Sequence, residues 1–86
     1  MGMPSGKQPM PGPFALAFAA EVRALMARQQ ISGADLARLT ERSQSYMSKR
    51  LRGESAFTAN DAEAISAALK VDLEALLVTA VRASRR

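Results

Sequence analysis

The sequence predicts an all-α fold, a compact bundle of five short helices in a single domain. All four prolines and three of the five glycines lie in residues 1–13, so no proline interrupts the remaining chain. Beyond that point, apolar residues recur at the three- and four-residue spacing of amphipathic helices. No alternating run of β-branched residues follows, which argues against strands. A length of 86 residues fits one domain.

The chain is expected to begin with a disordered segment over residues 1–13, because proline lacks the amide donor and glycine resists ordering. The folded domain is expected over 14–83, and its first helix over about 14–30. The apolar residues of that helix, which repeat at helical spacing, are Phe14, Phe18, Val22, Leu25 and Met26.

The second helix is expected over about 33–40. Ser32 has the side chain of an N-cap, and Asp35 stands where the acidic partner of a capping box belongs. The residues expected to be buried by this helix are Leu36, Ala37 and Thr40.

The third helix is expected over about 44–52, with Ser43 as its N-cap. Met47 and Leu51 would face the core. Gly53 follows at once, where a residue of positive φ commonly ends a helix.

Two further helices complete the bundle. Thr58 caps the fourth, with Asp61 three residues later, and Asp72 caps the fifth, which is expected over about 73–83. Residues 84–86 would form a basic tail. The fifth helix carries a broad apolar surface, made of Leu73, Leu76, Leu77, Ala80 and Val81.

Composition excludes several classes of function. The chain has no Cys and no His, and therefore no disulfide, no thiolate metal site and no histidine base. Its aspartates are explained as helix caps, so no nucleophile–base set remains, and we expect neither an enzyme nor a cofactor or metal. No apolar stretch is long enough to span a membrane, and a cytoplasmic location is expected. Twelve basic and eight acidic residues give a net charge of +4, which favours an acidic partner such as nucleic acid.

The positive charge is concentrated in the stretch from Arg42 to Ser55, which holds four cations and a single acid, Glu54. The second and third helices flank a turn of about three residues, which forces them to cross sharply. On the outer side of the third helix, amides and hydroxyls can pair with base edges while cations neutralise phosphates. The residues expected to read bases are Gln44, Ser45, Ser48 and Lys49. The residues expected to contact phosphates are Arg42, Ser43, Tyr46, Arg52, Ser55 and Thr58. For Tyr46, packing beside the turn is equally consistent with the sequence.

The stretch from Ile31 to Leu76 resembles the lambda-repressor-like helix-turn-helix family, also called the Cro/repressor or XRE type. "ISGADLARLTERSQSYMSKRLRGE" matches its hydroxyl cap, Leu-Ala pair, turn, Ser-capped recognition helix and closing Gly. "FTANDAEAISAALKVDLEALL" matches the helices that follow. A phage repressor of this family opens its recognition helix with Gln-Ser and contacts bases there, which implies the same role for Gln44 and Ser45.

Three features depart from the family pattern. Glu41 stands at the turn glycine. Gly33 stands where many members have a phosphate-contacting Gln that braces the reading amide, here Gln44. Met26 and Leu51 occupy the positions of an Arg–Glu pair between the first and third helices, and we interpret them as core.

The resemblance implies a sequence-specific regulator of bacterial or phage type, expected to be a repressor, that binds double-stranded DNA as a homodimer. Residues expected at the dimer interface are Leu73, Leu77, Ala80 and Val81. The alternative is a helical protein-interaction module, an adaptor or the antidote of a two-protein system, built on the same fold.

Overall fold

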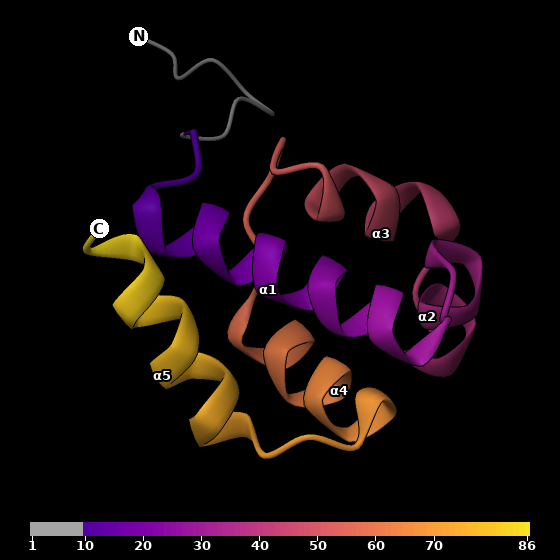
Figure 1. Cartoon of the computed structure of the whole chain (residues 1–86). Coiled ribbons are helices and arrows are strands. Elements are labelled where there is room, and N and C mark those ends of the chain that lie inside the picture. Colours follow the sequence, from indigo (N-terminus) through magenta and orange to yellow (C-terminus); the bar gives the residue numbers. More distant parts are fainter. Residues whose placement is uncertain (1–9) are drawn as a thin grey trace, which may run out of the picture.

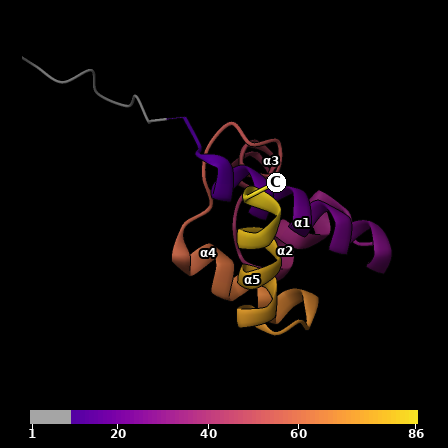
Figure 2. The same ribbon diagram turned by 60° about the vertical axis from the view of Figure 1, so that its left-hand side comes forward.

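The computed structural model describes residues 10–86 and confirms the all-α bundle. Five helices follow in order: α1 Pro13–Gln29, α2 Gly33–Leu39, α3 Gln44–Leu51, α4 Ala59–Leu69 and α5 Leu73–Ser84. No strand occurs within the described part of the chain. In both views α1 lies across the middle of the molecule, with α3 above it and α4 below (Figures 1 and 2).

The domain limits of the sequence analysis differ slightly from the helices. Residues 1–9, most of the segment expected to be disordered, lie outside the described residues. Pro13 belongs to α1, because a proline at the first helical position has no amide that the helix needs. Ser84, assigned to the basic tail, is the last residue of α5.

The N-termini of four helices are capped as the sequence predicts. In each case a side-chain oxygen accepts a hydrogen bond from the backbone N–H three residues later, which satisfies one of the donors that a helix start leaves free. The caps are Ser32, Ser43, Thr58 and Asp72.

Three helices are followed by a non-glycine residue in the left-handed conformation. Gln30, Glu41 and Lys70 each have φ of 59°, at a cost of about 1 kcal/mol each relative to the right-handed region. Gly53, with φ of 80°, follows α3 as expected. Glu41 therefore adopts the conformation for which the family uses glycine.

The core lies between α1 and the helices α3, α4 and α5, while α2 packs against α3 and α4. Met26 and Leu51, expected to be core, are both 8% exposed and belong to one apolar cluster. Phe14 was expected to be buried with them but is 41% exposed, because it lies in the first turn of α1, beyond the main core. The largest fully buried apolar side chains are Leu36, Met47, Ile65, Leu69 and Val22.

Side chains of α1 also complete the C-terminal ends of two other helices. The guanidinium Nη1 of Arg23 donates to the carbonyl oxygen of Leu51 at 2.6 Å, at the end of α3. The amide Nε2 of Gln29 donates to the carbonyl oxygen of Leu69 at 2.8 Å, at the end of α4. Since the last carbonyls of a helix lack partners within it, both contacts satisfy groups that would otherwise depend on water.

Candidate nucleic-acid interface

Helices α2 and α3 form the helix-turn-helix that the sequence predicts. Ala37, 3% exposed, is buried in α2 together with Leu36, which is fully buried. The turn begins at Thr40, whose buried hydroxyl donates to the carbonyl oxygen of Leu36 at 2.7 Å. Ser43 then caps α3 by accepting from the N–H of Tyr46 at 3.0 Å. The start of α3 is therefore fixed by local hydrogen bonds on both sides of the turn.

The outer face of α3 carries the residues that were expected to read bases. Gln44, Ser45 and Lys49 are exposed and Ser48 is half-buried, whereas Met47 on the inner side is 1% exposed. None of these four polar side chains is engaged in a hydrogen bond or ion pair with another residue in 10–86. The structure thus brings these four residues together on the outer face of α3, where their side-chain hydrogen-bond donors and acceptors are available to a ligand.

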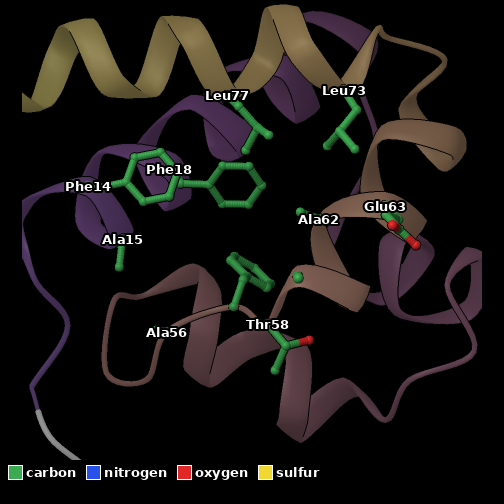
Figure 3. Close-up of a pocket in the computed structure, with 11 residues that line it drawn as sticks. Phe14, Ala15, Phe18, Ala56, Thr58, Ala62, Glu63, Leu73 and Leu77 are labelled. Atoms are coloured by element: carbon green, nitrogen blue, oxygen red, sulfur yellow. The ribbon is translucent and has the colours of Figure 1, made fainter.

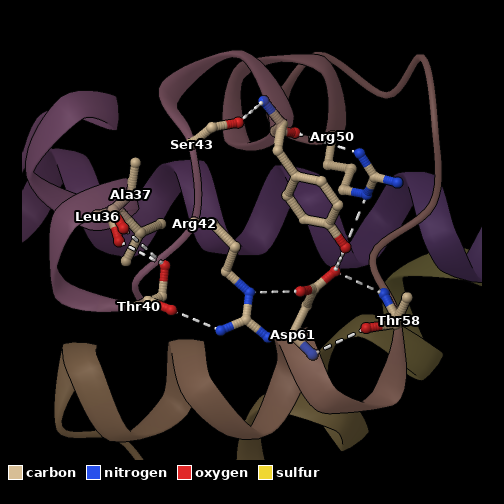
Figure 4. Close-up of polar contacts among 9 residues, drawn as sticks. Leu36, Ala37, Thr40, Arg42, Ser43, Arg50, Thr58 and Asp61 are labelled. Atoms are coloured by element: carbon tan, nitrogen blue, oxygen red, sulfur yellow. Dashed lines mark hydrogen bonds and ion pairs between the residues drawn. The ribbon is translucent and has the colours of Figure 1, made fainter.

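Two of the residues expected to contact phosphate are bound to Asp61 of α4 in the free protein (Figure 4). The Nε of Arg42 lies 2.8 Å from the carboxylate Oδ1 of Asp61, and its Nη1 donates to the carbonyl oxygen of Thr40 at 2.6 Å. The hydroxyl of Tyr46 donates to Oδ2 of the same carboxylate at 2.8 Å. Both side chains thus connect α3 to α4, and for Tyr46 this matches the packing alternative.

Arg50 lies on the other side of Tyr46. Its guanidinium carbon stands 3.5 Å from the centre of the Tyr46 ring, in a cation–π contact. Its Nε is 3.9 Å from Oδ2 of Asp61, too far for a hydrogen bond, and this buried atom has no hydrogen-bond partner within the described chain. Two guanidinium groups therefore share one carboxylate, which leaves the cluster with a net positive charge.

The hydrogen bonds at Asp61 also set its protonation. Burial favours the neutral acid and raises its pKa. Hydrogen bonds from the Thr58 backbone, the Tyr46 hydroxyl and the Arg42 guanidinium outweigh this, so the pKa of Asp61 lies below its ordinary value. Burial, together with the bond donated to the Asp61 carboxylate, raises the pKa of Tyr46. At neutral pH the carboxylate is charged and the phenol keeps its proton.

The remaining residues assigned to phosphate contact differ in availability. Arg52 is exposed, but its Nε pairs with the carboxylate of Glu54 at 2.7 Å. The hydroxyls of Ser43 and Thr58 accept cap hydrogen bonds and are exposed, so both can still donate. Ser55 is only 7% exposed, which leaves its hydroxyl little access to a phosphate.

The α5 surface differs from expectation at one position. Ala80 was assigned to the dimer interface, but it is 0% exposed because it points into the core of its own chain. Leu73 and Leu77 are half-buried and face an apolar cavity of about 510 Å³, which Phe14 and Phe18 of α1 also line (Figure 3). Val81 is half-buried.

Sequence reasoning missed one residue of this region, Asp61, which was expected only as part of a helix cap. It does form the capping box with Thr58, but it is also 1% exposed and binds two side chains of the helix-turn-helix. The capping pattern alone gives no indication of this, because Asp35 shows the same pattern on the surface.

These features define a helix-turn-helix protein, and comparison with known families agrees. A family model described as a helix-turn-helix domain matches residues 17–78. The chain belongs to this family, whose members are DNA-binding regulators and not enzymes, and the match confirms the helix-turn-helix that the sequence predicts.

Among solved structures, the chain is similar to two crystal structures of the clp gene regulator ClgR from Corynebacterium glutamicum. One has a TM-score of 0.76 at 22% identity, over 90% of this chain and 81% of that chain. The other has a TM-score of 0.73 at 22% identity, over 84% of this chain and 92% of that chain. At this identity the likeness shows the shared fold. No curated protein matches the sequence. Within residues 10–86, no helix combines the length and the apolar character that crossing a bilayer requires.

Proposed function

We propose that the chain is a sequence-specific regulator that inserts α3 into the major groove of double-stranded DNA. The observation that carries this proposal is the outer face of α3, where Gln44, Ser45 and Lys49 are exposed and unpaired beside Ser48. Gln can bond both donor and acceptor atoms of adenine, and the small serines let the helix approach the groove floor. Arg52 and Ser43 lie at the two ends of the same helix, where phosphates would pass.

In this proposal the regulator acts as a repressor and as a homodimer, in a bacterial cytoplasm at the nucleoid. Repression requires only that the bound protein blocks access to a promoter, so it needs no further surface for contact with another protein. Dimerisation is supported by the apolar hollow that α1, α4 and α5 line, and by Val78 of α5, which is 39% exposed. The same hollow is the observation that favours the alternative of a protein-interaction module.

Selection of bound sites from random duplex DNA tests this function. A two-fold dimer should enrich a palindrome whose half-sites are centred one helical turn apart, about 34 Å. Gln44→Ala should cost about 1–3 kcal/mol on the selected duplex and relax preference at one base pair, without changing the salt dependence. Arg52→Ala should weaken all duplexes alike and lower the salt slope by about one unit.

Arg82→Ala is the matched control, because it removes an exposed cation of α5, a helix that the proposal does not place on DNA. It should leave both preference and salt slope near those of the unmutated protein. No measurable affinity of the unmutated protein for any duplex at low salt would refute the proposal and favour the interaction module. A non-palindromic site, with a monomer in sedimentation on DNA, would refute the homodimer alone.

A further inference from the structure

Asp61 joins the front end of α3 to α4 through two contacts that approach its carboxylate from different sides. Arg42 reaches Oδ1 from the turn before α3, and Tyr46 reaches Oδ2 from the first turn of α3, both at 2.8 Å. The carboxylate is itself held by the N–H of Thr58 at 2.9 Å, so it cannot follow a movement of α3. The front end of α3 is therefore tied to a fixed point on α4 (Figure 4).

The residues that would read bases stand between these two contacts in the sequence. Gln44 and Ser45 lie between Arg42 and Tyr46, and the outer side of this turn is open to solvent. A base contact depends on the position and angle of the amide, because each hydrogen bond requires a narrow geometry. A shift of the front end of α3 would therefore alter which base edge Gln44 meets.

Asp61 also determines what Arg42 can do. The guanidinium of Arg42 uses its Nε on Asp61 and its Nη1 on the carbonyl oxygen of Thr40, and its side chain is 25% exposed. A cation that is held in this way is not free to follow a DNA phosphate. Removing the charge of Asp61 would release Arg42 and leave two guanidinium groups, of Arg42 and Arg50, without their shared anion.

We propose that Asp61 is a positioning residue for DNA recognition: its buried carboxylate fixes the angle of the base-reading end of α3 and withholds Arg42 from phosphates. This inference rests on the proposed function and deepens it. In this arrangement Asp61 raises the sequence preference of the protein while lowering its affinity for DNA of arbitrary sequence.

The test is Asp61→Asn, measured at a temperature where circular dichroism shows the variant to be folded. Binding is compared between the palindrome that the unmutated protein selects and the same duplex with one base pair changed in each half-site, over a range of salt. The ratio of the two affinities should fall about tenfold, as for the loss of one good base contact. Affinity for the changed duplex should rise, and its salt slope should increase by about one unit, because Arg42 becomes available to a phosphate.

Asp72→Asn is the matched control. It also removes one carboxylate from a helix start, and Asn remains an effective cap, but Asp72 lies at α5 and caps it by accepting from the N–H of Ala75 at 2.9 Å. It should leave the affinity ratio unchanged. A folded Asp61→Asn protein with the ratio and salt slope of Asp72→Asn would overturn the inference, and so would equal loss of affinity for both duplexes.

Tyr46→Phe keeps the inference testable if Asp61→Asn does not fold. It removes one hydrogen bond to the carboxylate and no charge, so the affinity ratio should fall about threefold with an unchanged salt slope. An unchanged ratio in this variant would overturn the inference. Failure of the proposed function is a separate result, because the unmutated protein would then bind no duplex at all.

Discussion

The starts of α2 and α4 carry the same local motif in different surroundings. Ser32 and Thr58 each accept a hydrogen bond at 3.0 Å from the N–H of the aspartate three residues later. Asp35 and Asp61 each return one, from the N–H of the cap residue, at 3.2 and 2.9 Å. Judged by the helix cap alone, the two sites are equivalent.

The two aspartates differ in what lies beyond the cap. Asp35 has a side chain that is 45% exposed, and its partner Arg38, at 2.8 Å, belongs to the same helix. Asp61 has a side chain that is 1% exposed, and its partner Arg42, also at 2.8 Å, lies 19 residues away in the chain. The two ion pairs have equal lengths but different roles. The Asp35–Arg38 pair stabilises a single helix, whereas the Asp61–Arg42 pair joins two parts of the molecule.

The largest expected effect separates the two aspartates by stability. Asp61→Ala should lower the free energy of unfolding by about 3 kcal/mol or more, because it removes the shared anion of a buried ion pair. Asp35→Ala should lower it far less, since water replaces the lost contacts at an exposed site. Urea denaturation of both variants measures the difference, and equal losses would show that burial does not distinguish the two boxes.

A smaller effect is expected from acid. The pKa of Asp61 lies below that of a free aspartate, so its stabilising contribution is complete above the unfolded-state pKa, about 3.9, and is lost as pH falls through the lower folded-state value. The stability gap between the unmutated protein and Asp61→Asn should be constant above about pH 5 and should narrow below about pH 4.

Asp35→Asn is the comparison for this acid titration. The pKa of Asp35 is also lowered, by hydrogen bonding with Ser32 and then with Arg38, but the site is open to solvent. The difference in free energy of unfolding between the unmutated protein and Asp35→Asn should be small at every pH. A difference in stability between the unmutated protein and Asp61→Asn that persists unchanged to pH 2.5, about 1.4 units below the free-aspartate pKa, would contradict the ionised, hydrogen-bonded carboxylate.

The smallest effect is expected at Arg38, whose side chain is 68% exposed. Arg38→Ala should change the free energy of unfolding by an amount close to measurement error, and the change should vanish in about 1 M salt, where surface charges are screened within about 3 Å. Arg42→Ala, measured beside it, should retain its effect in salt. An equally salt-sensitive loss in both variants would place Arg42 among ordinary surface cations.

The difference between the boxes also marks how far the sequence could predict the structure. The helix starts at Ser32 and Thr58 followed from two side chains three residues apart, and the start at Ser43 followed from its hydroxyl alone, which is information that the sequence displays directly. The face of α3 that carries Gln44 followed from helical period in the same way. Most of the fold and the outward strip of the candidate site are of this kind.

Contacts between distant residues could not be predicted in the same way. The binding of Tyr46 by Asp61 joins residues 15 positions apart and depends on where α4 lies relative to α3. The burial of Ala80 depends on the rotation of α5 about its own axis, which a broad apolar surface leaves undetermined. Similarly, the exposure of Phe14 depends on how far the core extends along α1.

The hydrogen bond from Arg23 of α1 to the last carbonyl of α3 gives the molecule a second fixed point, opposite Asp61. Because α3 is held at both ends, its orientation is fixed. Neither Arg23 nor Asp61, which hold it, is among the side chains on its outer face. Substitution of Gln44 or Ser45 can therefore change the preferred bases of a DNA site while the angle at which α3 docks stays constant. Substitution of Arg23 or Asp61 would tilt α3 and leave its base-contacting side chains unchanged. The base contacts and the orientation of α3 can therefore change independently among related proteins.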